Sequence, residues 1–399
     1  MQFKTFDIVP HGTKFDFVGK RHIAVVLSLI VNLAVILWSI PAIHGLNFGV
    51  DFAGGTEMEV RFAKTVDPSD IRKGVEALGF IDASVQTYGP ADENTYLIRT
   101  GRIALMTDAD VQRVVAAVNA KYPVQTSSFN AEIGDKIDLQ FVTPPTPDQI
   151  KAAVESAGIP VREVREEQGI TAGSKSFAVI TAGIRDQIEH GLRTRFAAEA
   201  PEVRRVEYVG PAVGRELRNQ GFKAILYAMA LIVLYVGLRF DFRFSPGVII
   251  ALVHDAIVTL GYFGFSGREF NLTSIAVILT VVGYSVNDTV VVYDRIRENQ
   301  QKYKGKSLSE IVNISINEVL GRTFLTSFAT ALSLIGLLVL GVGTIFDFAF
   351  AMLIGIISGT YSTWFIAAPM TIWLEERAAR KRAKAAPPAQ PPAPARAAK

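Results

Sequence analysis

The sequence predicts a polytopic α-helical membrane protein that carries a large α+β domain outside the bilayer. Of its 399 residues, 49% are hydrophobic and only 20% are charged, and the mean hydropathy is +0.28. Several apolar runs reach the ~18 residues that are needed to cross ~30 Å of hydrocarbon. Between the first two runs lies a long polar segment, residues 44–221, with patterns typical of strands and helices.

Six segments are expected to span the membrane. They are residues 23–43, 222–239, 247–265, 272–293, 324–343 and 348–373. The first segment is too long, and lies too far from Met1, for a cleavable signal peptide, and no small-residue cleavage site follows Pro41. It is therefore interpreted as a retained anchor.

The distribution of basic residues predicts the orientation. Lysine and arginine gather in residues 1–22, 294–322 and 374–399, whereas the opposite short loops contain only Arg268. Because cytoplasmic loops carry the excess of basic residues, both termini are expected in the cytoplasm. Residues 44–221 then form an extracytoplasmic domain.

Two cytoplasmic segments have distinct patterns. Ser307 and Glu310 form a capping box that opens an amphipathic helix, which is expected to lie along the inner membrane surface. Its apolar face consists of Leu308, Ile311, Val312, Ile316, Val319 and Leu320. The tail after Arg382 consists almost wholly of Ala, Pro, Lys and Gln, a composition typical of disorder.

The outer segment must be stabilised by its own hydrophobic core. The chain contains no cysteine, so disulfides cannot contribute. Residues 44–221 include 25 acidic and 20 basic residues without a basic stripe, which argues against nucleic acid as a partner.

An internal repeat divides this outer segment. The alternating strand pattern of residues 58–62 returns 79 positions later, at residues 137–141, and a helix opened by proline and closed by glycine follows each strand. Two strands, a helix and a last strand complete each half, which is the βαββαβ pattern of ferredoxin-like domains. We predict two tandem ferredoxin-like units, about 56–130 and 135–209; the alternative is one larger α/β domain.

Asp288 interrupts the fourth span within the apolar run Leu272–Val292. A carboxylate at this depth costs at least ~2.5–3.5 kcal/mol, so such residues usually face a polar pathway or a partner charge. Asp288, with Asn287 beside it, is either a polar helix contact or a group that takes up and releases protons. The second interpretation is favoured, because a polar stripe on the same helix leads toward the carboxylate. The stripe consists of Thr280, Tyr284, Ser285 and Thr289.

Further polar residues lie in other spans. Arg322 opens the fifth span and is interpreted either as an anchor at the inner interface or as a counter-charge for the buried carboxylate. His254 and Asp255 in the third span could extend a proton relay, or pair with each other and with neighbours for packing. Adjacent helix residues point about 100° apart, which argues against their sharing one ligand, and packing is favoured. Gly355 and Gly359 in the last span are spaced for a close helix contact.

Glycine-rich motifs flank the outer segment, one after the first span and one before the second. Glycine permits tight turns where non-helical backbone leaves or enters the bilayer. The motifs are interpreted as stiff elbows between the domain and the membrane. Their residues are Gly49, Asp51, Phe52, Gly54, Gly55, Gly210, Pro211 and Gly214.

Three stretches resemble the SecD/SecF family of protein-export membrane subunits, and the six spans in this order resemble its SecF branch. Residues 49–55 are similar to the family's Gly-x-Asp-Phe-x-Gly-Gly signature, residues 209–214 to its Val-Gly-Pro-x-Val-Gly element, and residues 283–299 to its fourth membrane helix. The resemblance implies half of a resistance-nodulation-division-type (RND-type) core, and a proton relay in which Thr326 and Ser327 take part. It implies a function that couples the proton-motive force to the late stages of polypeptide export.

The resemblance also implies partners and a location. The partners are SecD, the SecYEG translocon, the translocating preprotein and membrane lipid, with YajC as a further candidate. The location is the bacterial inner membrane, with the large domain in the periplasm, and the proton gradient replaces a cofactor. The sequence has no Walker A, His-Glu-x-x-His or Gly-x-Ser-x-Gly motif and no cysteine-containing metal set, so neither an enzyme nor a metal site is expected. The alternatives are a proton-driven exporter of small molecules or lipids and a passive translocon scaffold.

Overall fold

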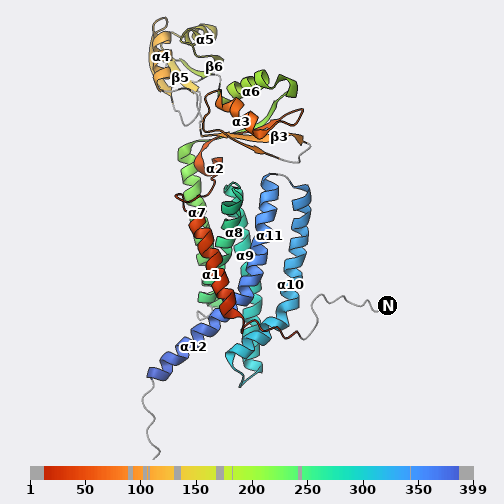
Figure 1. The fold of residues 1–399 in the computed structure, drawn as a ribbon. Coiled ribbons are helices and arrows are strands. Elements are labelled where there is room, and N and C mark those ends of the chain that lie inside the picture. Colours follow the sequence, from red (N-terminus) through yellow and green to blue (C-terminus); the bar gives the residue numbers. More distant parts are fainter. Residues whose placement is uncertain are drawn as a thin grey trace, which may run out of the picture.

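Six long helical spans form a bundle in the computed structural model, and two small α/β units lie beyond one end of it (Figure 1). The structure describes residues 13–88, 93–101, 106, 108–129, 136–167, 175–181, 183–240, 245–341 and 343–385. The beginning of the predicted cytoplasmic N-terminus, residues 1–12, and the end of the predicted disordered tail, residues 386–399, lie outside the described residues.

Each predicted span corresponds to a helix that is long and apolar enough to cross a membrane. The spans are α1 (Arg21–Trp38), α7 (Pro211–Arg239), α8 (Ser245–Ser266), α9 (Leu272–Lys302), α10 (Leu308–Leu340), and a last one formed by α11 (Thr344–Ser362), the π-helical turn η3 (Thr363–Ala367) and α12 (Ala368–Ala385). The prediction of six transmembrane helices is confirmed.

Several helices extend past the predicted spans. α7 begins at Pro211 rather than at residue 222, and α9 continues to Lys302 rather than ending at residue 293. Residues 294–302 contain neither proline nor glycine, so the polar residues that follow the apolar run of α9 do not end this helix. Hydropathy therefore locates the membrane-embedded portion of a helix but not its ends.

The two segments that were predicted to be cytoplasmic also differ from the prediction. The amphipathic helix is not a separate element, because its capping box at Ser307 starts α10, which then runs uninterrupted to Leu340. The predicted apolar face is present in the first turns of α10, where Ile311, Val312 and Ile316 are buried. α12 continues to Ala385, through part of the tail that was predicted to be disordered.

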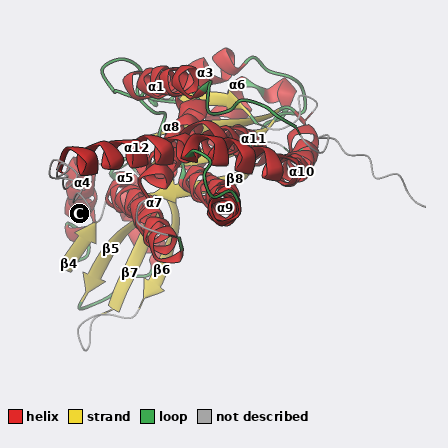
Figure 2. Cartoon of the chain, turned by 90° about the horizontal axis from the view of Figure 1, so that it is seen from below, coloured by secondary structure: helices red, strands yellow, loops and turns green. Residues whose placement is uncertain are grey.

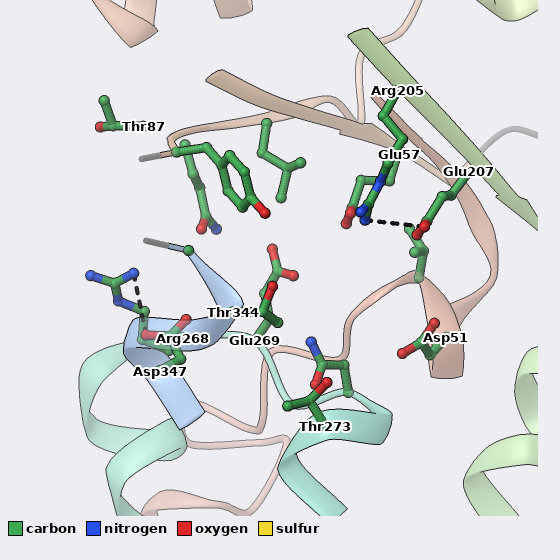
Figure 3. A pocket seen from close by; sticks show the side chains of 16 residues that line it. Asp51, Glu57, Thr87, Arg205, Glu207, Arg268, Glu269, Thr273, Thr344 and Asp347 are labelled. Carbon is green, nitrogen blue, oxygen red and sulfur yellow. Dashed lines mark ion pairs between the residues drawn. The ribbon is translucent and has the colours of Figure 1, made fainter. Parts of the chain in front are cut away.

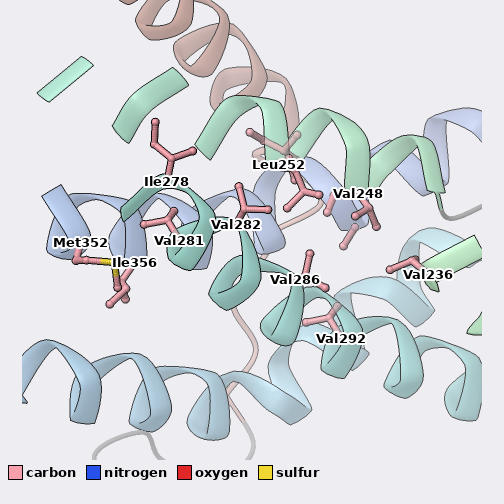
Figure 4. Close-up of a cluster of buried hydrophobic side chains, with 14 of the residues drawn as sticks. Val236, Val248, Leu252, Ile278, Val281, Val282, Val286, Val292, Met352 and Ile356 are labelled. Carbon is pink, nitrogen blue, oxygen red and sulfur yellow. The ribbon is translucent and has the colours of Figure 1, made fainter. Parts of the chain in front are cut away.

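The helices of the bundle pack around a hydrophobic core, and side chains of α9 lie in the middle of it (Figure 4). Residues of α8, α9 and α11 meet there: Val248, Leu252, Ile278, Val281, Val282, Val286, Met352 and Ile356. The small residues of α11 permit this approach, as predicted. A Cβ at Gly355 would overlap the Val281 side chain, and one at Gly359 would lie 3.0 Å from Ser285 Cβ.

The outer segment folds into two α/β units, preceded by the short helix α2 (Val50–Ala53). The first unit consists of β1 (Gly55–Arg61), α3 (Pro68–Glu76), β2 (Ser84–Thr87), β3 (Thr95–Thr100), α6 (Ile184–Arg195), the 3₁₀ turn η2 (Ala197–Glu199) and β8 (Glu202–Val209). The second consists of α4 (Asp108–Asn119), β4 (Val124–Phe129), β5 (Lys136–Phe141), α5 (Pro147–Ser156), β6 (Val161–Glu167) and β7 (Lys175–Thr181). Both proline-led helices are present, with Asp67 as the N-cap of α3 and a Thr146 capping box on α5.

Each unit contains one four-stranded antiparallel sheet. The strand orders are β2-β3-β1-β8 and β4-β5-β7-β6, so β1 and β5 occupy equivalent central positions. Seen from below, the strands of the second sheet lie side by side beyond the edge of the helix bundle (Figure 2). The repeated pattern in the sequence therefore does correspond to two equivalent strands.

The predicted division into tandem ferredoxin-like units, 56–130 and 135–209, is wrong. α4 and β4, assigned to the first unit, complete the second, and α6 and β8, assigned to the second, complete the first. The two cores show the exchange: Ile184 and Ile188 of α6 pack in the first core, whereas Val114 of α4 packs in the second. The second unit is thus inserted between β3 and α6 of the first.

The connections to the membrane account for this arrangement. β1 begins directly after α2, and β8 ends directly before α7. Because the two strands pair antiparallel, with Gly55 opposite Val209, both connections lie side by side at the same corner of one sheet. A helix–strand pair with an apolar face fits the edge of either sheet, so the repeat alone does not specify which sheet it joins.

Excision of the second unit is expected to leave the first unit folded. All elements of the first sheet and both of its helices lie in residues 55–100 and 184–209. A soluble segment 55–209 in which residues 103–182 are replaced by a Gly/Ser linker is therefore expected to unfold cooperatively on heating. The fragment 56–130 lacks α6 and β8 and is expected to be unfolded. Circular dichroism of both proteins checks this, and cooperative unfolding of 56–130 would contradict the interleaved fold.

Candidate functional site

A buried carboxylate, Asp288, lies on α9 within the helix bundle and is only 3% exposed. Ser327 of α10 donates a hydrogen bond of 3.4 Å to Asp288 Oδ2, and the Ser327 hydroxyl lies 2.9 Å from Thr360 Oγ1 of α11. Within the described part of the chain, Asp288 accepts no other hydrogen bond. An ionised carboxylate can accept about four hydrogen bonds, so one long bond leaves the anion poorly satisfied. This environment suits a carboxyl group that changes its protonation state.

The structure separates the predicted relay residues. Ser327 contacts Asp288, whereas Asn287 is exposed on another side of α9 and the Thr326 hydroxyl bonds to a backbone carbonyl of its own helix. Arg322 is exposed, and its charge acts on Asp288 through space. Among the described residues Arg322 has no ion-pair partner, so the counter-charge interpretation lacks a direct contact.

The predicted polar stripe on α9 divides between two sides of the helix. The Tyr284 hydroxyl donates to the Thr326 carbonyl oxygen at 3.0 Å, on the α10 side. Ser285 instead faces Asp255 of α8, and the Thr289 hydroxyl lies 2.9 Å from that of Thr363 in η3. Residues 284 and 285 are adjacent and point about 100° apart, so they cannot form one path. The expectation of a single stripe that leads to Asp288 is wrong.

A second buried carboxylate, Asp255 of α8, has the opposite kind of environment. It is 0% exposed, and hydroxyl groups from two other helices surround it. Ser285 Oγ and Ser362 Oγ donate to Oδ2 at 2.6 and 2.7 Å, and Ser358 Oγ donates to Oδ1 at 2.7 Å. His254 Nδ1 lies 3.0 Å from the same Oδ1.

His254 and Asp255 contact each other, as the packing interpretation of the sequence allowed. Their Cα–Cβ bonds diverge, but the imidazole is long enough to reach back to the shorter carboxylate. The sequence places Ser285 only in the polar stripe of the fourth span, and it does not assign Ser358 and Ser362 to this site. Ser358 and Ser362 are four residues apart on α11, one helical turn, and this spacing of hydroxyl residues in an apolar span was the available signal.

The outer domain is attached to the beginning of α9. Gly49 N donates to the Phe270 carbonyl oxygen at 3.0 Å, and Asp51 Oδ2 accepts from Leu272 N at 3.1 Å. Phe52 is 1% exposed and packs on Phe270, with ring centroids 5.8 Å apart. A carboxylate at a helix N-terminus satisfies a free N–H group and interacts favourably with the helix dipole. α2, which leads into β1, is therefore bound to the helix that carries Asp288.

Glycines allow the two connections to the membrane to pass one another. Gly54 and Gly55 have φ angles of +77° and +124°, which favour glycine. A Cβ at Gly214 would lie 3.0 Å from Gly54 N. The predicted turn at Gly210 and Pro211 is not a separate element, since Gly210 is the N-cap of α7 with a φ of −64° and Pro211 is its first residue.

A cavity of about 270 Å³ lies between the first outer sheet and the outer ends of α9 and α11 (Figure 3). Its charged lining consists of Asp51, Glu57, Glu207, Glu269, Asp347, Arg205 and Arg268. Arg205 pairs with Glu207 at 3.0 Å and Arg268 with Asp347 at 3.4 Å. Among the described residues, no group of His, Asp and Glu side chains is arranged to hold a metal ion. The first pair lies within β8, whereas the second joins the loop before α9 to α11.

Arg99 of β3 joins the outer sheet to the membrane part beside this cavity. Its Nε lies 2.8 Å from Glu57 Oε2, and its Nη2 pairs with Glu269, which precedes α9. The three side chains are 10–14% exposed. Burial raises the pKa of Glu57, and the positive charge of Arg99 opposes this rise; burial also lowers the pKa of Arg99, which Glu57 opposes. The charged forms of Glu57 and Arg99 therefore stabilise each other against the cost of burial.

Replacement of Arg99 by Gln is expected to loosen this junction. Both carboxylates would lose their cation, and hydrogen bonds between charged groups contribute about 1.5–3 kcal/mol each. Hydrogen exchange of β1 and of residues 268–272, measured by mass spectrometry on the whole chain, is expected to become about tenfold faster or more. Arg61→Gln, at an exposed position of β1, is the matched control. Equal exchange in the two variants would show that Arg99 does not hold the junction.

The effect of Arg99→Gln is expected to grow with pH. The pKa of Glu57 in the folded protein lies above its ordinary value of 4.5, so the folded state binds this proton more tightly than the unfolded state. The stability that this group contributes is present below 4.5 and is lost as the pH rises through the raised pKa. Without Arg99 that pKa rises further. The ratio of exchange rates between variant and wild type is therefore expected to be smaller at pH 5 than at pH 7.

Comparison with known proteins now decides the family. Residues 191–377 match the family described as "Protein export membrane protein SecD/SecF, C-terminal", and residues 40–66 match the "SecD/SecF GG Motif". The protein translocase subunit SecF of Magnetococcus marinus is 36% identical over 370 residues, which cover 93% of this chain and 95% of that protein. The chain belongs to the SecF family. The SecF subunit of Rickettsia prowazekii is 33% identical and covers 96% of this chain and 98% of its own length.

The fold of this SecF chain also resembles solved structures. The crystal structure of SecDF from Thermus thermophilus, described as a translocon-associated membrane protein, matches 92% of the chain with a TM-score of 0.65 and 28% identity. A structure of SecDF in the super-membrane-facing form matches 94% with a TM-score of 0.56. The chain spans 39% and 40% of those longer proteins. The GG-motif match covers the elbow residues from Gly49 to Gly55, and the other match covers those from Gly210 to Gly214 and both buried carboxylates.

Proposed function

We propose that this SecF protein is a subunit of the bacterial Sec translocase and couples the proton-motive force to the late stages of polypeptide export. The observation that carries the proposal is Asp288, a buried carboxylate with a single long hydrogen bond from Ser327. Protons that move down their gradient would bind to Asp288 and leave it. Each charge that crosses 100 mV releases ~2.3 kcal/mol, so a few protons suffice to move a domain. The gradient is the energy source, and no cofactor takes part.

α9 is the element that transmits this event to the outer side. Asp288 lies sixteen residues after Leu272, about 24 Å along the helix. A change at the contact with Ser327 would shift α9 against α10. Because the outer end of α9 is bonded to Gly49 and Asp51, the shift would reach β1 and the outer units. The units would then alternate between postures that grip and release an emerging polypeptide.

SecD is the partner that we propose for the bundle. Two exposed stripes of small and polar residues run along α9 and α10, and a Cβ at Gly283 or Gly336 would meet nothing within 4 Å, which leaves room for another helix. The stripes consist of Ala276, Thr280, Gly283 and Asn287 on α9, and Thr326, Ala329, Ser333 and Gly336 on α10. The match to 39% of a SecDF chain supports a partner that supplies the other half of an RND-type core. SecYEG, the preprotein, lipid and YajC are further partners in this proposal.

The proposal places both termini in the cytoplasm and the outer units in the periplasm. Its support is the asymmetry of basic residues between the two sides. A periplasm-dependent reporter fused after Lys136 is expected to be active, and the same reporter fused after Lys304 to be inactive. A cytoplasm-dependent reporter is expected to behave in the opposite way at both positions. Equal activity of one reporter at both sites would contradict this orientation.

Depletion of the protein distinguishes the export function from the alternatives. The export function predicts that unprocessed secretory precursors accumulate in the cytoplasm, and that SecD and the translocon channel co-purify with the protein from native membranes. A proton-driven exporter of small molecules or lipids would change drug sensitivity or lipid content without precursor accumulation. A passive scaffold would support full export with a neutral residue at position 288.

A further inference from the structure

We propose that His254 and Asp255 form a second proton-binding site in the transmembrane core, in which His254 binds the proton and Asp255 is a fixed anion. This site lies on the α8 side of α9, whereas Asp288 lies on the side of α10 and α11. Asp255 is the eleventh of 22 residues in α8, near the middle of the span. The proposal deepens the proton-coupled function and rests on it.

The surroundings of Asp255 are built for an anion. Three serine hydroxyls donate to it within 2.6–2.7 Å, and His254 Nδ1 contacts the same carboxylate. A protonated carboxyl group would bring a donor of its own and displace one of these four donors. Hydrogen bonds to the charged form of an acid favour that form. The contrast with Asp288, which accepts one bond of 3.4 Å, assigns the fixed charge to Asp255 and the exchanging carboxyl to Asp288.

His254 is placed to bind the proton that balances this anion. Because an ionised carboxylate can only accept, the 3.0 Å contact assigns a hydrogen to Nδ1 and leaves the lone pair of the neutral imidazole on Nε2. Within the described residues, Nε2 has no hydrogen-bond partner. Protonation at Nε2 gives an imidazolium beside the carboxylate and a net neutral pair, which a low-dielectric core favours over a lone buried charge.

Neighbouring helices place no further acidic or basic side chain against this pair in the described structure. Ser285 on α9 and Ser358 and Ser362 on α11 face Asp255, and the Tyr361 ring lies 5.9 Å from the His254 ring. The Tyr361 hydroxyl donates to the Ala24 carbonyl oxygen of α1 and is thereby occupied. Among the described residues, Asp255 is consequently the charged group that contacts His254.

The two sites act on the same two helices. On α9, Ser285 lies three residues before Asp288, so the bond to Asp255 fixes the rotation of the helix that carries the exchanging carboxyl. On α11, Ser358 and Ser362 flank Thr360, which contacts Ser327. A change of charge at His254 alters the strength with which Asp255 holds its serines. The occupancy of one proton site therefore affects the geometry of the other.

Nitrogen-15 NMR of histidine measures this protonation directly. The whole chain, labelled at its five histidines and embedded with its co-purified partner in lipid bilayers, is titrated from pH 8 to pH 5 without a gradient. His254→Asn retains an N–H group near the position of Nδ1 but cannot bind a proton, so the signal that it removes identifies His254. That signal is expected to change from neutral imidazole to imidazolium between pH 8 and pH 5. Asp255→Asn is expected to remove most of the imidazolium signal at pH 5.

The outcomes separate this proposal from the broader function. A His254 signal that remains neutral, or remains imidazolium, from pH 8 to pH 5 would overturn the proton site, whatever the export assay shows. An imidazolium signal at pH 5 that is as strong in Asp255→Asn as in the wild type would overturn the role of Asp255 as the fixed anion. In gradient-driven export, His254→Asn is expected to lose at least half of the stimulation, whereas His190→Asn, at an exposed position of α6, is expected to retain it. Full stimulation with His254→Asn would show that the site takes no part in coupling. Failure of the Asp288 variants to uncouple export would overturn the proposed function but not the titration of His254.

Discussion

Asp288→Asn is expected to abolish the stimulation of polypeptide export by the proton gradient, with a loss of at least about tenfold in the gradient-dependent rate, which corresponds to ~1.4 kcal/mol. Asparagine has nearly the same volume and can still accept a hydrogen bond from Ser327, so the packing among α9, α10 and α11 is retained. It cannot bind and release a proton. Asp288→Glu retains a carboxyl group and is expected to keep part of the activity.

The measurement is translocation of a precursor into inverted vesicles that contain the assembled complex, with and without an imposed gradient. Asp294→Asn is the matched control, because this residue is on the same helix but its side chain is 63% exposed near the inner end. Normal expression and partner binding of both variants are required for the comparison. If Asp288→Asn retained the full gradient-dependent stimulation, Asp288 would be a structural polar contact and the proposed proton coupling would be wrong.

Hydropathy and residue type were sufficient to locate the spans and Asp288. A charged residue inside an apolar run has few physical explanations in a bilayer, so the sequence identifies it without a structure. The residues around Asp288 were harder to predict from the sequence. Ser327 came from family resemblance, and Thr360 was not identified, because one threonine in an apolar helix is unremarkable until three helices meet around it.

The Asp255 site and the outer junction depend on contacts between segments that are distant in sequence. Asp255 is thirty residues from Ser285 and more than one hundred from Ser358, and Arg99 is far from Glu269. Helical periodicity states which residues share a face, but not which face meets which neighbour. The same limit explains the error in the outer domain. The repeat identified equivalent strands, whereas the assignment of α6 and β8 to the first sheet follows from the pairing of β1 with β8 near the membrane.

Gly55→Ala is expected to disrupt the junction between the outer domain and the membrane, and with it export. Gly55 has a φ of +124°, where L-residues are strained, and an added Cβ would overlap the Thr100 carbonyl oxygen and lie 3.1 Å from Gly101 Cα. Both obstacles are backbone atoms of the neighbouring strand, so the strand itself must move. Overpacking against backbone in addition to conformational strain is expected to cost about 4 kcal/mol or more.

Gly79→Ala separates these two causes. Gly79 also has a positive φ, +93°, but no atom of the described residues lies within 4 Å of the position that its Cβ would take. Gly79→Ala is expected to lower the free energy of unfolding by the cost of backbone strain alone, about 1–2 kcal/mol. The measurements are hydrogen exchange of β1 and β3 in the whole chain and the accumulation of unprocessed precursors in cells that rely on each variant. Gly55→Ala is expected to expose both strands and to block export, while Gly79→Ala leaves export near normal. Equal effects of the two substitutions would mean that backbone strain, and not the close approach of β1 to β3 beside the elbow, is the reason for glycine at position 55.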